Sequence, residues 1–188
     1  MVVPIVDLEV CSLALLQIGC WPLASTVSSR EGELCERLYP FAVEGLLSSY
    51  PWSFATTEVR LSPVSGVEKY GWEYVYLPPA EILRIIALES EGGEQVDYAR
   101  MDRYLYAEVA PAVLYGIKNV APSFFPAYFR TALVARLAYL LSMPLTEDSQ
   151  RTQMLYQLAE KETKDSRTID AQSKPPQRLR SFPLVEVR

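Results

Sequence analysis

The sequence predicts an α+β fold: an antiparallel helical bundle with an inserted antiparallel β-sheet or sandwich and an extended C-terminal arm. Three observations lead to this prediction. Residues 122–143 carry apolar side chains at helical spacing, which is typical of a buried core helix. Residues 52–120 contain short runs rich in tyrosine, valine and isoleucine that are separated by turn residues, with no helical pattern between them. Residues 169–188 contain three prolines and no apolar stripe, so we expect an extended arm there.

These patterns divide the chain into three parts. Residues 1–51 and 121–168 are predicted to form one discontinuous helical bundle, residues 52–120 an inserted β domain, and residues 169–188 a docking arm. The 188 residues suffice for one domain with an insertion, and an apolar content of 49% supports a packed core.

Composition excludes most enzyme classes. The chain has no histidine, which removes Ser-His-Asp and Cys-His catalysis and histidine-bearing metal sites. It also lacks a GxxxxGK[ST] loop and a GxGxxG fingerprint. Its three cysteines show no CxxC spacing, so we expect reduced thiols in a cytoplasmic product and no metal or cofactor. A net charge of −5 argues against a nucleic-acid-binding main surface.

The first helix is expected to run to about Ile18. Asp7 is a suitable N-cap and Gly19 can adopt the left-handed conformation that ends a helix. The turn that follows contains Trp21, which is predicted to fill the space between helices.

The second helix is expected to begin at Ser28, with Glu31 three residues later completing a capping box. Pro40 falls inside this helix and should kink it, and the helix should end near Tyr50 because Pro51 follows. Its predicted buried stripe consists of Leu34, Leu38, Phe41, Ala42, Gly45 and Leu46.

The inserted region contains six strand candidates. Apolar and polar residues alternate over residues 55–61, which is typical of a half-buried strand. The other candidates are residues 72–77, 82–88, 95–99, 104–106 and 112–118. Gly92 and Gly93 indicate a hairpin that joins residues 82–88 to residues 95–99.

The central helix carries a stripe of Phe125, Phe129, Leu133, Leu137 and Leu140. A transmembrane span is the alternative, but Arg130 and Arg136 argue against it, because a charge near a bilayer centre costs about 3 kcal/mol on insertion scales. Two arginines on a buried helix require carboxylate or carbonyl partners, in this subunit or in another one.

The last helix is predicted to be capped by Thr146 and to end near Thr168. Residues 172–188 carry four basic residues against Glu186, a net charge of +3 on an acidic chain. Four scattered cations would bind DNA only weakly, so a protein partner is preferred. The predicted docking residues are Arg178 and Arg180, which would pair with acids, and Phe182, Leu184 and Val185, which would form an apolar anchor.

Two clusters in the inserted region could carry chemistry. Glu89, Glu91, Glu94 and Asp97 are the densest carboxylates, but they surround a Gly-Gly turn, which favours a solvated hairpin tip over an acid/base pair. The aromatic residues could form a base-stacking or sugar-binding platform, although a sheet core with hydroxyls at its rim is preferred. They are Tyr70, Trp72, Tyr74, Tyr76, Tyr104, Tyr106 and Tyr115.

The chain also resembles a known family over nearly its whole length, through motifs that follow in order. They are EVCSLALLQIGCWPLAS, then LYPFAVEGLLSSYPWSFATTEVRLSP, GWEYVYLPPAEILRI and VAPSFFPAYFRTALVARLAYLLSMPLTED, followed by a polar helix. The family is the head-to-tail adaptor of short-tailed bacteriophages, called tail tubular protein A. The motifs that carry the resemblance do not include residues 89–108 or the last fifteen residues.

The resemblance implies a structural virion protein at the head–tail junction, assembled in the host cytoplasm, and not an enzyme. Such proteins form a ring, usually of twelve copies, between the capsid portal and the tail nozzle. Genomic DNA passes through the centre at ejection without sequence-specific binding, and an acidic lumen would repel its phosphates. No membrane partner is implied.

The placement of Arg130 and Arg136 on an otherwise apolar helix predicts that both are held by carboxylates, at least one of them across a subunit boundary. The family resemblance and the short, turn-rich strands suggest that Glu91 and Glu94 lie on a tail-facing loop, and the arm is predicted to dock on the portal. The alternatives are another neck protein, such as a head-completion or stopper protein, or a carboxylate-dependent polysaccharide hydrolase. The latter would require two inward-facing acids about 5–10 Å apart in a cleft.

Overall fold

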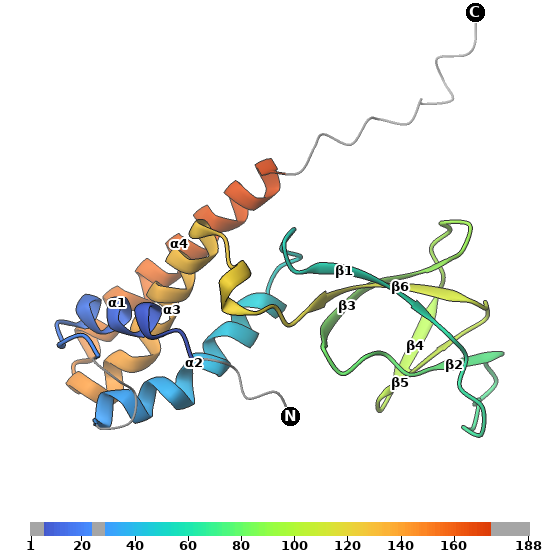
Figure 1. Ribbon diagram of the computed structural model, residues 1–188, viewed down its shortest axis with the longest axis horizontal. Coiled ribbons are helices and arrows are strands. Elements are labelled where there is room, and N and C mark those ends of the chain that lie inside the picture. Colours follow the sequence, from blue (N-terminus) through green and yellow to red (C-terminus); the bar gives the residue numbers. More distant parts are fainter. Residues whose placement is uncertain (1–5, 24–28, 174–188) are drawn as a thin grey trace, which may run out of the picture.

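The computed structural model describes residues 6–23 and 29–173, so the predicted docking residues of the arm lie outside the described part of the chain. Within that part, four α-helices occupy one side of the molecule and two three-stranded antiparallel sheets occupy the other (Figure 1). All six strands lie between the second and third helices in chain order. The predicted α+β class, with antiparallel strands inserted into a helical unit, is confirmed.

Helix α1 (Leu8–Ile18) has the predicted caps. The Asp7 carboxylate accepts hydrogen bonds from the backbone N–H of Glu9 at 3.0 Å and of Val10 at 3.3 Å, and Gly19 adopts a φ of 92°. The prediction for Trp21 is wrong, because this side chain is 90% exposed. Residues of the helices themselves fill the space between α1 and α2, among them the buried Cys11 and Cys35.

Helix α2 (Arg30–Ser48) starts later than predicted. Its cap is Ser29, whose hydroxyl accepts the backbone N–H of Gly32 at 3.1 Å, and not Ser28, which lies outside the described residues. Pro40 lies inside the helix as expected, but Phe41 is 63% exposed, contrary to the predicted stripe. The buried face is rotated toward Cys35, Tyr39, Ala42, Val43, Leu46 and Leu47.

The β half is a small two-sheet structure with its own core. One sheet has the order β1 (Thr56–Leu61), β6 (Ala112–Lys118), β3 (Ile82–Ser90). The other has the order β2 (Tyr74–Tyr76), β5 (Tyr104–Ala107), β4 (Tyr98–Met101). The buried residues between them are Leu61, Tyr76, Leu88, Leu105, Ala107, Ala112 and Leu114.

The predicted hairpin between β3 and β4 exists only at its turn. The Ser90 N–H donates to the Glu94 carbonyl and the Val96 N–H to the Leu88 carbonyl, both at 2.8 Å. Beyond the turn the two strands enter different sheets, β3 pairing with β6 and β4 with β5. Gly116 permits the close β3–β6 approach, because a Cβ at this position would lie 2.9 Å from the Arg84 carbonyl oxygen.

Helix α3 (Ala127–Thr146) is the predicted central helix, preceded by a 3₁₀ turn, η1 (Pro122–Phe124). Its buried residues occupy most of its circumference, as expected, although Leu140 is only partly buried. Among the described residues, no helix is both long enough and apolar enough to cross a membrane.

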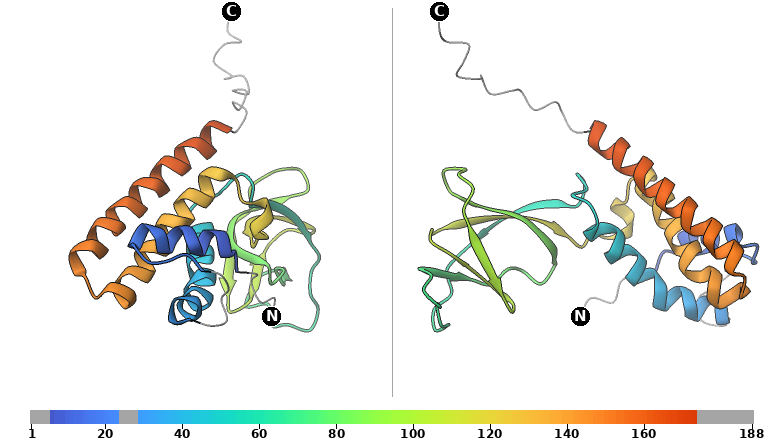
Figure 2. Two further views of the ribbon diagram at one scale, coloured as in Figure 1. Left: turned by 60° about the vertical axis from the view of Figure 1, so that its left-hand side comes forward. Right: turned by 180° about the vertical axis from the view of Figure 1, so that it is seen from behind.

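Helix α4 (Ser149–Ser173) packs along α3 (Figure 2) and differs from the prediction at both ends. Asp148 caps it by accepting the Arg151 N–H at 3.0 Å, whereas Thr146 belongs to the last turn of α3. The helix continues past Thr168 through Ser173, so the predicted start of the arm at residue 169 is wrong. The reason is Asp170, which is fully buried and bonded to other elements.

Candidate functional site

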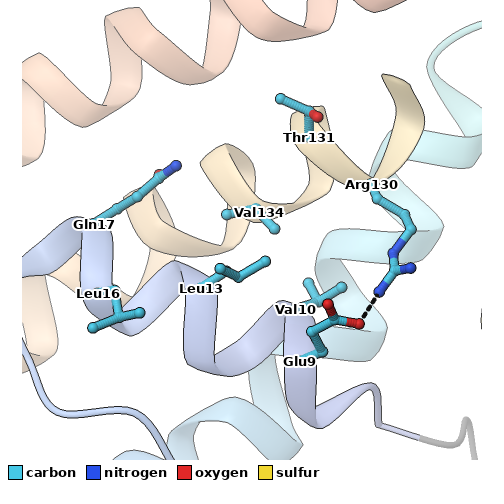
Figure 3. A pocket seen from close by; sticks show the side chains of 8 residues that line it. All are labelled: Glu9, Val10, Leu13, Leu16, Gln17, Arg130, Thr131 and Val134. Carbon is cyan, nitrogen blue, oxygen red and sulfur yellow. Dashed lines mark hydrogen bonds and ion pairs between the residues drawn. The ribbon is translucent and has the colours of Figure 1, made fainter. Parts of the chain in front are cut away.

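The main candidate site is a groove between α1 and α3 (Figure 3). It has a volume of about 480 Å³ and lies along the outer side of α1. Its lining residues are Glu9, Val10, Leu13, Leu16, Gln17, Arg130, Thr131 and Val134. Leu13 and Leu16 form much of its apolar surface, yet they are 45% and 53% exposed.

The groove exists because α1 is apolar on two faces. One face, which includes Ala14, Leu15 and Ile18, is buried against the bundle. The opposite side presents Leu13 and Leu16, where a surface helix of an isolated domain normally carries charged or polar residues. Exposed apolar side chains that lie together on one helix face form the kind of surface on which another molecule can dock.

An ion pair closes one end of the groove. Nη2 of Arg130 lies 2.6 Å from a Glu9 carboxylate oxygen and 3.5 Å from one of Asp7, and the hydrogen bond with Glu9 raises the Arg130 pKa. The pair ties the start of α3 to the start of α1 and places one cation and one anion at the groove entrance (Figure 3).

The second arginine of the central helix has a looser contact. Nη1 of Arg136 lies 3.7 Å from Oε1 of Glu160 on α4, and both side chains are partly exposed. Both Arg130 and Arg136 therefore have carboxylate partners within their own chain. A partner from a second subunit stays a prediction.

A buried carboxylate at the junction of the two halves was missed by the sequence analysis. Asp170 accepts hydrogen bonds from the Ser53 N–H at 3.0 and 3.1 Å, the Ser53 hydroxyl at 2.6 Å and the Tyr128 hydroxyl at 2.7 Å. Burial and the bond to Asp170 raise the pKa of Tyr128 to about 12. Three donors thus satisfy this carboxylate, which favours a structural role over proton transfer.

Aromatic residues surround this junction. Trp52 is fully buried, stacks on Tyr128 at 6.4 Å between ring centroids, and packs edge-on against Phe129 at 5.1 Å. Its indole N–H donates to the Leu46 carbonyl at 2.9 Å. The junction therefore fixes the connection between α2 and β1 against α3 and α4.

The carboxylate cluster of the β half is a surface turn. Glu91, Glu94 and Asp97 are exposed, and Glu91 pairs with Arg60 of β1 at 2.6 Å. None of the described pockets is lined by these acids, which agrees with a solvated tip and not with an acid/base pair. Whether Glu91 and Glu94 face a tail component stays a prediction.

The aromatic residues of the β half do not form a continuous platform. Tyr76 and Tyr106 are buried, and the Tyr76 hydroxyl donates to the Val109 carbonyl. Tyr70 is exposed and packs edge-on against Tyr106 at 6.0 Å. These tyrosines thus lie partly in the core of the β half and partly at its rim, which agrees with the predicted sheet core with hydroxyls at its rim.

Residues 6–23 and 29–173 contain no cluster of three histidine, cysteine or acidic residues that could hold a metal ion. A comparison of the chain with protein-family models and with curated proteins finds no match in either.

Proposed function

We propose that the protein is a structural subunit of the ring-shaped head-to-tail adaptor of a short-tailed phage, between the portal and the tail nozzle. The proposal is supported by the order and spacing of the four motifs that resemble this family. The observation in the structure that carries it is the exposed apolar groove between α1 and α3, which an isolated subunit would leave in water.

The occupant of the groove is a neighbouring copy of the same chain. In a ring each subunit uses two different surfaces, so one apolar face per copy is covered by a different face of the next copy. Leu13 and Leu16 are about half exposed, so covering each of them completely would contribute roughly 1 kcal/mol, about half the value for a wholly exposed leucine. The Glu9–Arg130 pair at the groove entrance would fix the register of the neighbour through charge.

The remaining surfaces fit the other contacts of an adaptor. The β half lies away from the bundle (Figure 1), so it is available for the tail nozzle while the helices form the ring. The arm, with Arg178, Arg180 and Phe182, would dock on the portal. The net charge of −5 suits a channel through which DNA slides without binding.

The test is ring formation by a groove variant. The double substitution Leu13→Glu and Leu16→Glu should abolish rings seen by electron microscopy, alone or with portal, because two charges would enter the apolar contact. Its matched control is Met154→Glu with Ile169→Glu on α4, where the side chains are 66% and 46% exposed and lie outside the groove. Rings from the groove variant would contradict the proposed contact.

Another neck protein is the alternative function. A head-completion or stopper protein would differ in copy number and in position within the virion, which mass measurement of the isolated neck complex would reveal.

A further inference from the structure

A second concave site lies in the β half, at the beginning of β3. It has a volume of about 560 Å³ and is lined by two segments, residues 77–85 and 100–103. Small-molecule sites usually measure about 300–1,000 Å³ and combine an apolar lining with a few polar groups. The apolar lining residues here are Leu77, Pro78, Pro79, Ala80, Ile82 and Ile85, and the charged ones are Arg84, Arg100 and Arg103. We refer to this site as the arginine pocket.

The three arginines have no anionic partner among the described residues. No acidic residue lines the pocket, and none of the three forms an ion pair. Arg84 donates to the Ser48 carbonyl at 3.1 Å and Arg103 to the Tyr104 hydroxyl at 3.0 Å, so both bond to neutral groups. The Arg100 side chain forms no hydrogen bond within the described part of the chain. Three cations around one hollow repel one another, so an anion that contacts them all would relieve this repulsion.

The charge of the pocket fits a group of phosphates better than a single carboxylate. One carboxylate carries one negative charge and would leave the other cations uncompensated. A diphosphate or triphosphate carries several charges on adjacent groups, and the planar guanidinium group donates two parallel hydrogen bonds to phosphate oxygens. The apolar lining, which includes Pro79, Ile82 and Ile85, would contact a flat ring and not a phosphate. The lining therefore indicates a ligand that joins phosphate groups to an apolar ring.

An added peptide strand is one alternative occupant, because β3 is an edge strand of its sheet. Such a peptide needs a regular row of unpaired backbone donors and acceptors. The pairing of β3 with β6 instead shifts register between Ile82 and Arg84 and again between Ile85 and Ala87, in the part of β3 that lines the pocket. Irregularities of this kind bend an edge strand and disfavour pairing with a further chain.

A long nucleic acid is the second alternative. Glu81 and Asp102 belong to the two segments that form the pocket, and both are exposed, although neither lines it. A polyanion that extends beyond the pocket would meet these acids on a chain whose net charge is −5. A small ligand held within the pocket avoids them.

We propose that the arginine pocket binds a nucleoside di- or triphosphate. The phosphates lie on the three guanidinium groups, and the base packs against the apolar lining. This binding activity does not depend on the proposed ring, because the arginine pocket and the α1–α3 groove have no lining residue in common.

Calorimetric titration of the full chain at low salt tests the ligand class. The probe is dATP, which should bind with a Kd below about 1 mM. Inorganic triphosphate should bind about tenfold more weakly, because it lacks the base that contacts the apolar lining. A single-stranded thymidine oligonucleotide and a glutamate-rich peptide should also bind more weakly than dATP.

Substitutions in the pocket test the site. Arg100→Ala with Arg103→Ala should weaken dATP binding about tenfold or more, because charge-assisted hydrogen bonds are lost. Arg100→Lys with Arg103→Lys keeps the charge without the planar fork and should recover only part of the affinity. Arg37→Ala with Lys161→Ala removes two exposed cations outside the pocket and should bind dATP like wild type. All three variants should melt close to wild type, because the substituted side chains are exposed.

Four results would overturn the inference. They are wild type that does not bind millimolar dATP, an alanine pocket variant that binds dATP like wild type, inorganic triphosphate that binds as tightly as dATP, and an oligonucleotide or peptide that binds more tightly than dATP. The last result would assign the pocket to a macromolecule. Ring formation with portal is a separate measurement, so the failure of either proposal can be told from the failure of the other.

Discussion

Replacing Asp170 with alanine removes the acceptor that joins the end of α4 to the rest of the molecule. In the folded protein this carboxylate is fully buried and accepts hydrogen bonds from the Ser53 N–H, the Ser53 hydroxyl and the Tyr128 hydroxyl. Asp170→Ala leaves all three donors without a protein partner, in a junction packed with aromatic rings.

The expected loss follows from these contacts. A hydrogen bond to a charged group contributes about 1.5–3 kcal/mol, and a buried donor without a partner costs about 1–3 kcal/mol. The Tyr128 hydroxyl is partly buried and can turn toward water, so the two Ser53 donors dominate. We therefore expect Asp170→Ala to lower the free energy of unfolding by about 3–5 kcal/mol.

Urea denaturation followed by circular dichroism measures this loss. Asp165→Ala is the matched control, because Asp165 lies on the same helix, is exposed, and should change stability by no more than about 0.5 kcal/mol. A loss below about 1 kcal/mol for Asp170→Ala, at an unchanged dependence on urea, would refute the assigned role of the junction.

Three further predictions concern stability and docking. The pKa of Tyr128 is raised from 10.0 to about 12 in the folded protein, so the folded state favours the neutral hydroxyl. The contribution of Tyr128 to the free energy of unfolding is therefore complete below pH 10 and is lost as the pH rises toward 12. Tyr128→Phe should therefore show a smaller fall in unfolding free energy across that window in urea titrations, and an equal fall would contradict the shift. Gly116→Ala should lower the free energy of unfolding by about 1–3 kcal/mol because the new Cβ meets the Arg84 carbonyl at 2.9 Å. Gly45→Ala should raise the free energy of unfolding by about 0.5–1 kcal/mol, because no atom lies within 4 Å of a Cβ added at this position. Equal melting temperatures for the Gly116→Ala and Gly45→Ala variants would contradict this prediction. Truncation after Ser173 should leave the melting temperature unchanged and abolish portal binding in a pull-down, and retained binding would exclude the docking arm.

Local signals in the sequence predicted the elements well. Asp7 and Gly19 define the ends of α1, because both act through hydrogen bonds and dihedral angles within a few residues. The alternation that ends at Leu61 predicted β1, since a half-buried strand has a side-chain period of two. The apolar stripe around Phe129 likewise predicted the buried central helix.

Contacts between distant residues could not be predicted in the same way. Asp170 lies in a polar helix and resembles any solvated acid, and its partner Ser53 is 117 residues away. The partner of β3 is β6 and not the nearer β4, because pairing depends on the β3–β6 approach that Gly116 allows. Trp21 was assigned to the interior by its residue type alone, whereas the interior was already filled.

The candidate site was only partly predictable. The placement of Arg130 on an apolar helix indicated a carboxylate partner, and Glu9 is that partner. The exposed apolar face of α1 was not predicted from the sequence. Leu13 and Leu16 are apolar like the buried residues of the same helix, so only the structure shows which face is exposed. The arginine pocket combines two segments of the β half, residues 77–85 and 100–103, so the sequence contains no local pattern for it.

The central claim is that this chain closes into a ring on the portal. Electron microscopy of the purified wild-type protein mixed with portal tests it most directly. The account predicts closed rings stacked coaxially on the portal, with the helical halves in lateral contact through the α1–α3 groove. Isolated monomers or two-fold dimers in the presence of portal would contradict it.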